Sequence, residues 1–173
     1  YLLKKISMAQ VVNKEWFRDW FSSPFYHRLY FERDEREAEE FIQKLVNFLQ
    51  PSPGSRMLDV ACGRGRHSCM LAKMGFDVTG FDLSFESVEY AKQFEKDNLT
   101  FYQHDMRYPF WANYFDCAFN FFTSFGYFKT RREHDDAIRT IANGLKPRGV
   151  FDIDYLNVHH SEDHLVYKET KKI

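Results

Sequence analysis

Residues 57–68 read MLDVACGRGRHS, and this stretch decides the fold of the chain. An apolar run that contains one acid, Asp59, leads into the glycines Gly63 and Gly65, after which the pattern becomes helical. Glycine tolerates positive φ and lets backbone approach a ligand, while the free amides at a helix start form a polar cradle. We therefore expect a strand, a tight turn and a helix. A turn of this kind also occurs as a plain corner that binds nothing.

Short apolar segments alternate with amphipathic segments after this turn. Strands are expected over residues 56–61, 77–81, 99–104, 115–121 and 149–155, and helices over residues 66–74, 84–95 and 131–145. Parallel strands need crossover connections, so this order predicts an α/β fold whose central, mostly parallel sheet has helices on both faces. In such sheets, ligands bind at the carboxyl ends of the strands, where the strand order reverses.

The residues before the first strand have a different pattern. Apolar side chains recur at helical spacing over residues 34–49, and Pro51, Pro53 and Gly54 end that helix. Residues 13–31 are rich in aromatic side chains and predict a short amphipathic helix followed by a turn. We expect an N-terminal helical cap segment over residues 1–50 and a Rossmann-like domain over residues 51–173.

Two acids in this pattern favour a bound ligand. Asp59 lies inside an apolar strand, where a carboxylate is costly to bury unless loop amides or a cofactor amine partner it. Asp82 ends the second strand, 17 residues after Gly65, where an acid can accept hydrogen bonds from both hydroxyls of a ribose. Alternatively, Asp82 caps the helix that begins near Ser84.

The third expected strand leads to Asp105 and Met106. This pair suits an adenine ring, because the carboxylate accepts from the exocyclic amine and the thioether packs on the ring. The alternative is that Asp105 simply starts a turn.

Composition restricts the classes of function. The 173 residues carry a formal net charge of -1 and are 44% hydrophobic, so bulk charge gives no support to a nucleic-acid partner. No apolar run approaches the roughly 20 residues of a membrane span, and the 3 cysteines do not form a disulfide framework, so we expect a cytoplasmic protein. His159, His160 and His164 fit an exposed loop, and no metal site is expected.

The ordered set of motifs resembles class I S-adenosylmethionine-dependent methyltransferases, most closely the small-molecule type with a CGxGRH loop. The runs that carry this resemblance are MLDVACGRGRHS (57–68), VTGFDLS (78–84), HDMRYPF (104–110), FDCAFNFFTSFGYF (115–128) and LKPRGVFDIDYLN (145–157). The resemblance covers roughly residues 32–157. It implies S-adenosylmethionine as the cofactor and a small molecule as the methyl acceptor.

The resemblance also implies a set of cofactor-binding residues. Asp59, Ala61, Cys62, Gly63 and Gly65 would surround the methionine part, Asp82 would hold the ribose, Leu83, Asp105 and Met106 would frame the adenine, Asn120 would lie near the transferred methyl group, and Tyr30 and Arg33 would cover the cofactor. Ala61 departs from the family pattern, in which glycine is more frequent. For Tyr30 and Arg33, a solvated helix start with an aromatic core residue is an equal alternative.

The family sheet has seven strands, and the last two have no counterpart in this sequence, apart from residues 166–168 as a candidate start of the sixth. We therefore expect a chain truncated at its C-terminus or a sheet completed by another chain, with self-association at an open edge. Residues 124–128 are candidates for the wall of the acceptor pocket; the alternative is that the aromatic run over residues 119–128 is only a buried strand and its exit. His67, Tyr155 and Asn157 are positioned to face the acceptor, and none of them is assigned as a base.

Three hypotheses of function follow. The first is a small-molecule methyltransferase. The second is a nicotinamide-dependent oxidoreductase, which predicts a third glycine at position 68, where this chain has Ser68. The third is a cofactor-binding or pairing subunit that has lost its acceptor half.

Overall fold

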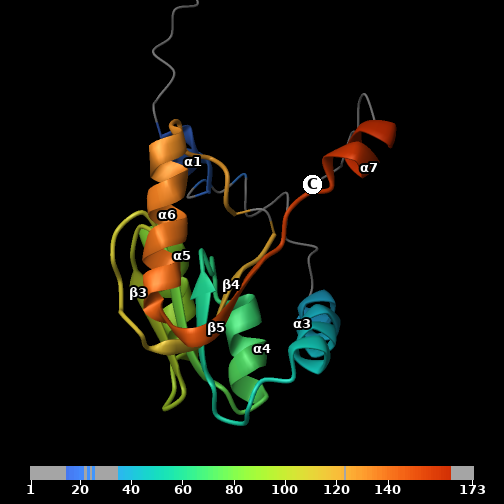
Figure 1. The fold of residues 1–173 in the computed structure, drawn as a ribbon, viewed down its shortest axis with the longest axis vertical. Helices are drawn as coiled ribbons and strands as arrows, with labels where there is room; N and C mark the ends of the chain where they lie inside the picture. Colours follow the sequence, from blue (N-terminus) through green and yellow to red (C-terminus); the bar gives the residue numbers. More distant parts are fainter. Residues whose placement is uncertain (1–14, 22, 24, 26–34, 123, 165–173) are drawn as a thin grey trace, which may run out of the picture.

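A five-stranded parallel sheet forms the centre of the molecule (Figure 1). The structure is a computed structural model, and it describes residues 15–21, 23, 25, 35–122 and 124–164. The strands lie in the order β3-β2-β1-β4-β5. Their bounds are Arg56–Val60 (β1), Asp77–Asp82 (β2), Leu99–Gln103 (β3), Phe115–Asn120 (β4) and Leu145–Ile153 (β5). The strand order reverses between β1 and β4, and the α/β prediction is confirmed.

Helices cover both faces of the sheet, because successive strand residues point to opposite sides. Met57 of β1 belongs to a core cluster shared with α3 (Glu35–Leu49), α4 (Arg66–Lys73) and α5 (Phe85–Ala91). Its neighbour Leu58 belongs to a second cluster shared with α6 (Arg131–Gly144). Figure 1 shows α6 on the other side of the sheet from α3 and α4.

Two of the expected boundaries differ most from the structure. The helix expected over residues 84–95 ends as α5 at Ala91, and a short 3₁₀ helix, η1 (Lys92–Phe94), follows it. The fifth strand begins at Leu145 rather than Gly149, because Leu145 already pairs with Phe115 before a bulge. Pro147 has no amide hydrogen to donate and Arg148 has φ 68°, so the ladder is interrupted there and resumes at Val150.

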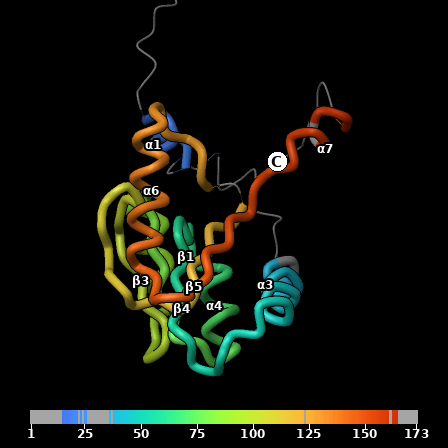
Figure 2. Tube along the Cα trace, in the orientation of Figure 1, coloured from blue at the N-terminus to red at the C-terminus, as the bar shows by residue number. Residues whose placement is uncertain are grey.

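Two short helices flank the domain. The aromatic N-terminal segment contains α1 (Trp16–Phe21), which lies near α6 and away from α3 in Figure 2. The expected loop at His159 and His160 is instead the helix α7 (Val158–Asp163), because Asn157 caps its first turn. Among the described residues, no helix is long and apolar enough to cross a membrane.

The remaining expectations about organisation stay predictions. The division at residue 50 stays a prediction, and α3 packs directly on α4. Residues 166–168 lie outside the described residues. Within the described part of the chain, β5 pairs only with β4, so self-association through this edge also stays a prediction.

Candidate functional site

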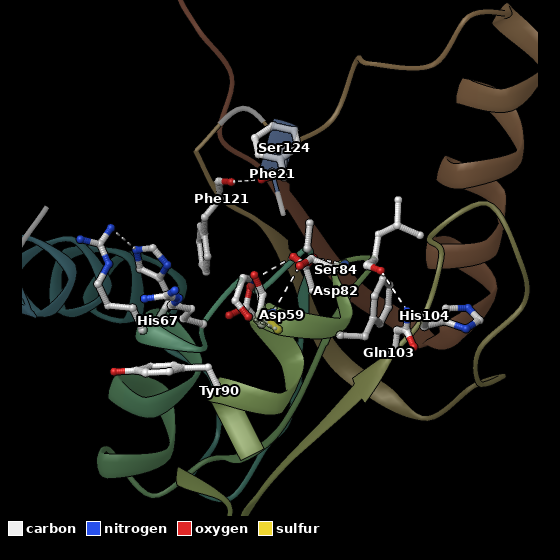
Figure 3. A pocket seen from close by; sticks show the side chains of 18 of the residues that line it. Phe21, Asp59, His67, Asp82, Ser84, Tyr90, Gln103, His104, Phe121 and Ser124 are labelled. Carbon is white, nitrogen blue, oxygen red and sulfur yellow. Dashed lines mark hydrogen bonds between the residues drawn. The ribbon is translucent and has the colours of Figure 1, made fainter. Parts of the chain in front are cut away.

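A cavity of about 1330 Å³ lies at the carboxyl ends of the strands. Its lining includes residues that follow β1, β2, β3 and β4, as the strand order predicts. Figure 3 shows Asp59 and Asp82 near its middle, with His67 toward one end and His104 toward the other. Of the residues expected to bind the cofactor, Asp59, Ala61, Cys62, Gly63, Asp82, Leu83, Asp105 and Met106 line this cavity.

The turn after β1 brings its two glycines into different surroundings. Gly63 has φ 56°, and a Cβ built on it meets nothing within 4 Å, so its backbone is open to the cavity. Gly65 has φ 80°, and a Cβ there would lie 2.5 Å from the Cζ of Phe101. Gly65 is therefore required by packing between α4 and β3, and it does not line the cavity.

Asp59 is buried at 1% exposure and has a partner that sequence reasoning missed. The hydroxyl of Ser68, itself buried on α4, donates to Asp59 Oδ2 at 2.5 Å. Burial raises the pKa of Asp59 to about 7, with a smaller rise from the nearby charge of Asp82, while the bond from Ser68 opposes this shift. Ser68 therefore fixes the carboxylate, at the position where a dinucleotide turn would carry glycine.

Asp82 joins the glycine turn to the start of α5. Its Oδ2 accepts from the Gly63 amide at 2.8 Å, and its Oδ1 accepts from the Ser84 amide at 2.8 Å. Burial raises the pKa of Asp82, and these backbone hydrogen bonds oppose the rise. The helix cap itself is Ser84, whose hydroxyl accepts from the Ser87 amide, so Asp82 supports this cap from outside the helix.

Asp105 is held by side-chain cations. Arg107 donates to both of its oxygens, from Nε at 3.0 Å to Oδ1 and from Nη2 at 2.6 Å to Oδ2, and Arg18 of α1 donates to Oδ2 at 3.3 Å. Burial alone would raise the pKa of Asp105, but the hydrogen bonds and charges of the two arginines outweigh it and lower the pKa. The carbonyl of Asp105 also accepts from the Tyr108 amide, so the expected turn is present.

The other expected cofactor residues differ in how far they reach the cavity. Met106 lines it, and its carbonyl accepts from the Thr140 hydroxyl at 2.5 Å. Asn120 ends β4 as expected, but it is 1% exposed and does not line the cavity. Its side-chain amide donates to the Val60 carbonyl at 2.9 Å, while Asn120 Oδ1 is buried and has no hydrogen-bond partner among the residues that the structure describes. Tyr30 and Arg33 lie outside the described residues.

Aromatic rings form the wall beyond β4, and we call them the acceptor-side wall. Its members are Phe17 and Phe21 of α1, Phe121 and Phe122 after β4, and Tyr127 and Phe128. The Tyr127 ring centroid lies 5.3 Å from that of Phe21. Buried His67 stacks on Phe122 at a ring-centroid distance of 5.0 Å and lines the cavity, as does Ser124. Of the residues expected to line the acceptor pocket, Ser124, Tyr127 and Phe128 line this cavity, whereas Phe125 and Gly126 do not.

Tyr155 and Asn157 do not line this cavity. A Cβ on Gly126 would lie 3.1 Å from the Tyr155 hydroxyl, and Asn157 accepts from the His160 amide at 3.1 Å. The described residues contain no group of three or more side chains that could hold a metal ion.

Sequence reasoning missed Arg107 and two charged residues of the N-terminal segment, Glu15, which contacts Arg107, and Arg18, which contacts Asp105. Arg107 lies in the run HDMRYPF, but its partner Glu15 is 92 residues away in the sequence, and no local spacing links the two. The contribution of α1 to the cavity was missed for the same reason.

A family model described as a methyltransferase domain matches residues 57–149, which is more than half of the chain. The chain belongs to the S-adenosylmethionine-dependent methyltransferase family. S-adenosylmethionine is the cofactor of this family. The matched range contains the glycine turn and the acids after β2 and β3, so the resemblance in sequence is confirmed at the level of the family.

Relatives within this methyltransferase family extend beyond the length of the chain. The methyltransferase-family protein YqeM of Bacillus subtilis (strain 168) is 37% identical over 68% of this chain and 47% of its own length. A dTDP-3-amino-3,4,6-trideoxy-alpha-D-glucopyranose N,N-dimethyltransferase of Streptomyces venezuelae is 36% identical over 63% of this chain and 45% of its own. The chain thus spans about half the length of these curated relatives.

A solved structure supports the same fold. The crystal structure of Streptomyces venezuelae DesVI matches with a TM-score of 0.63 and 28% identity, over 76% of this chain and 57% of that chain.

Proposed function

We propose that this chain binds S-adenosylmethionine in the cavity and transfers its methyl group to a small-molecule acceptor. One observation carries the proposal: the open backbone of Gly63 and the carboxylate of Asp82 are joined by a 2.8 Å hydrogen bond at the carboxyl ends of β1 and β2. This arrangement presents a polar turn beside an acid, which together suit an adenosyl ligand.

The donors and acceptors at the glycine turn fit the cofactor well. Ionised Asp82 has about four acceptor positions on its two oxygens, and one backbone amide engages each oxygen, so capacity remains for a ribose diol. Asp59 lines the cavity from below the turn, where a carboxylate can face the cationic amine of a methionine moiety. Leu83 and Met106 offer apolar contacts to an adenine ring.

The fit is poorer at Asp105. Its two oxygens already accept several hydrogen bonds from Arg107 and one from Arg18. An adenine amine would have to compete with Arg18, the longest of these contacts at 3.3 Å. We therefore propose that Asp105 holds Arg107 first and contacts adenine second.

The reaction asks the chain chiefly to align two reactants and exclude water. S-adenosylmethionine, when bound, supplies a methyl group on a cationic sulfur; the acceptor takes the methyl group, and the rest of the cofactor leaves as a neutral thioether. The acceptor-side wall consists of aromatic rings from α1 and from the segment after β4, and such a lining favours exclusion of water from this end of the cavity. His67 is a polar side chain packed against this wall, and we assign it orientation rather than proton transfer.

Two observations support a small acceptor. The formal net charge of -1 offers no bulk attraction to a polyanion. A relative at 36% identity is named for an amino sugar acceptor.

Calorimetric titration with S-adenosylmethionine, S-adenosylhomocysteine and NAD tests the cofactor. We expect saturable binding of both adenosyl compounds and none of NAD, and the reverse preference would overturn the proposal. Incubation with a panel of small amines, phenols and carboxylic acids, followed by mass spectrometry, tests the transfer. Binding without any methylated product contradicts the catalytic part and favours the pairing-subunit alternative.

A further inference from the structure

We propose that Arg107 is a positioning residue that connects the cofactor end of the cavity to the acceptor-side wall, so that a ligand at one end orders the other. The claim that this connection affects binding of the methyl acceptor rests on the proposed function. The contacts of Arg107 within the protein do not depend on it.

Arg107 is fixed to the cofactor end through Asp105. Its own amide and its side chain both donate to this carboxylate, and the Nη2–Oδ2 contact is 2.6 Å. The side chains of Arg107 and Asp105 are 11% and 9% exposed, so solvent screens this pair less than a surface pair. The carboxylate thereby sets the plane of the guanidinium.

The rest of the guanidinium reaches segments that are far apart in the sequence. Nη1 donates to Glu133 in the first turn of α6 at 2.8 Å, and Nη2 donates to Glu15, just before α1, at 2.8 Å. The Phe128 ring lies under the guanidinium, with its centroid 5.0 Å from Cζ. Only a planar guanidinium can donate in three directions and stack at the same time.

Arg107 thus connects the acceptor-side wall to Asp105, which follows β3. Phe17 and Phe128 are wall residues whose ring centroids lie 6.0 Å apart, and Phe128 also stacks on Arg107. Arg18, the residue that follows Phe17 in α1, contacts Asp105. The position of α1 over the cavity thus depends on charged groups that also shape the adenine end.

The charge balance of this cluster predicts what removal of Arg107 does. Three carboxylates, Glu15, Asp105 and Glu133, face two cations, Arg107 and Arg18. Without Arg107, the three carboxylates repel one another, and Arg18 is the one cation of this cluster that remains to offset their charge. Glu15 then loses the ion pair that links α1 to Arg107. We expect α1 to separate from the domain while the core stays folded.

Amide hydrogen exchange of the ligand-free protein tests the first half of the proposal. Arg107→Met should raise the exchange rates of residues 16–21 about tenfold, whereas the amides of β1 and β4 should be unchanged. Arg107→Lys should not restore protection, because one ammonium cannot reach all three carboxylates. The matched control is Arg139→Met, which removes an exposed α6 arginine that bonds to Asp136 at 3.0 Å. Equal exchange of α1 in the Met variant and the wild type would overturn the proposal.

Titration with S-adenosylhomocysteine tests the coupling. The ligand should slow exchange of residues 16–21 in the wild type, and this protection should be absent in Arg107→Met. Coupling is reciprocal, so Glu15→Gln, which loosens only the α1 side, should weaken S-adenosylhomocysteine binding by the factor by which the ligand protects α1. This second variant decides the question if Arg107→Met does not fold. An affinity in Glu15→Gln equal to that of the wild type would overturn the coupling.

A kinetic measurement separates positioning from a general loss of structure. Once an acceptor is known, Arg107→Met should raise the KM for that acceptor more than it lowers kcat, because the wall is displaced while the cofactor turn stays intact. If S-adenosylhomocysteine does not bind the wild type at all, the proposed function fails, and the ligand-free exchange experiment still decides the role of Arg107.

Discussion

At the glycine-turn end of the cavity, backbone amides and one serine hold the carboxylates, whereas at the exit of β3 side-chain cations hold them. Asp82 accepts from the amides of Gly63 and Ser84. Asp105 accepts from the side chains of Arg107 and Arg18. The two ends therefore differ in what fixes their geometry, the turn itself in one case and long, flexible side chains in the other.

This difference has consequences for electrostatics. Asp59 is buried and Asp82 is partly buried, and both have neutral hydrogen-bond partners, so desolvation raises the pKa values of both carboxyl groups. Asp105 faces cations, and its pKa is lowered. At the turn end, local backbone contacts fix the geometry, but the surroundings disfavour the ionised form of the carboxyl groups. At the β3 end, the arginines favour the ionised form of Asp105, but the geometry depends on contacts with segments that are distant in the sequence.

The largest predicted effect concerns Asp59 and pH. The pKa of Asp59 is about 7 in the folded chain and 3.8 ordinarily, so between these values the folded state retains a proton that the unfolded state has lost. The free energy of unfolding should therefore fall as pH rises from about 4 to 7 and level off above that. The contribution amounts to at most about 4 kcal/mol, at about 1.4 kcal/mol for each pKa unit.

Urea denaturation of the wild type and of Asp59→Asn across pH 4.5 to 8 measures this contribution. The asparagine variant does not titrate, so it should gain stability relative to the wild type as pH rises. Ser68→Ala serves as the second variant. Loss of the hydrogen bond from Ser68 should raise the pKa of Asp59 further, so the pH range over which stability falls should extend to higher pH. A difference between the wild type and Asp59→Asn that stays constant with pH contradicts the prediction.

The next effect separates the two glycines of the turn. Gly65→Ala places a Cβ 2.5 Å from the Cζ of Phe101 at φ 80°, so it should reduce the free energy of unfolding by about 3 kcal/mol through overpacking and backbone strain. Gly54→Ala is the matched control, since its φ is 72° and nothing lies within 4 Å, and it should cost about 1 kcal/mol.

Gly63→Ala should behave differently from both. Its cost in stability should resemble that of Gly54→Ala, because no atom lies within 4 Å of the added Cβ. The methyl group would instead point into the cavity and weaken S-adenosylmethionine binding. Equal losses of stability in the Gly63 and Gly65 variants would contradict the division between a packing glycine and a ligand-facing glycine.

A smaller effect is expected for Asp82→Asn at the same end. The amide side chain retains one acceptor oxygen and replaces the other with a donor, so one backbone contact and the bonds to a ribose diol are lost. We expect S-adenosylmethionine affinity to fall about tenfold to a hundredfold, the equivalent of a charge-assisted hydrogen bond of about 1.5 to 3 kcal/mol.

Asp77→Asn is the control for this calorimetric measurement. Asp77 begins β2, at the end of the strand opposite to Asp82, and its side chain is 49% exposed and 3.8 Å from Arg56 Nε. Affinity should be unchanged in this variant. An Asp82→Asn protein that binds as tightly as the wild type would remove Asp82 from the cofactor site.

The turn end could be predicted from sequence because its determinants are local. The apolar run before Gly63 and the helical pattern after Gly65 specify a strand, a turn and a helix within a dozen residues. The parallel order of the strands then places Asp82 beside this turn. The α/β class followed from the same alternation, and the structure confirms it.

The β3 end could not be predicted in the same way. Nothing in the spacing of Glu15, Arg107 and Glu133 indicates that they meet, because the chain must fold before their side chains become neighbours. Local sequence likewise gave no sign that Leu145 would pair with Phe115 ahead of a bulge. Adjacent residues determine the conformation of a turn, whereas the tertiary fold determines which charged side chains come together in a cluster.

The smallest predicted effect tests this contrast directly with salt. Raising NaCl from about 0.1 M to about 1 M shortens the Debye length from about 10 Å to about 3 Å. Glu15 and Glu133 are 34% and 31% exposed, so screening should weaken their attraction to Arg107 by less than about 1 kcal/mol. Amide exchange of residues 16–21 should therefore accelerate severalfold at most.

The amides of residues 62–65 should not respond to salt, because Gly63 donates to a carboxylate through a short, partly buried backbone bond. Arg107→Met provides the control, since its α1 exchange should be fast at both salt concentrations. If residues 62–65 respond as strongly as residues 16–21, both ends of the cavity depend on charge to the same degree. The distinction between an end held by backbone and an end held by side chains would then be wrong.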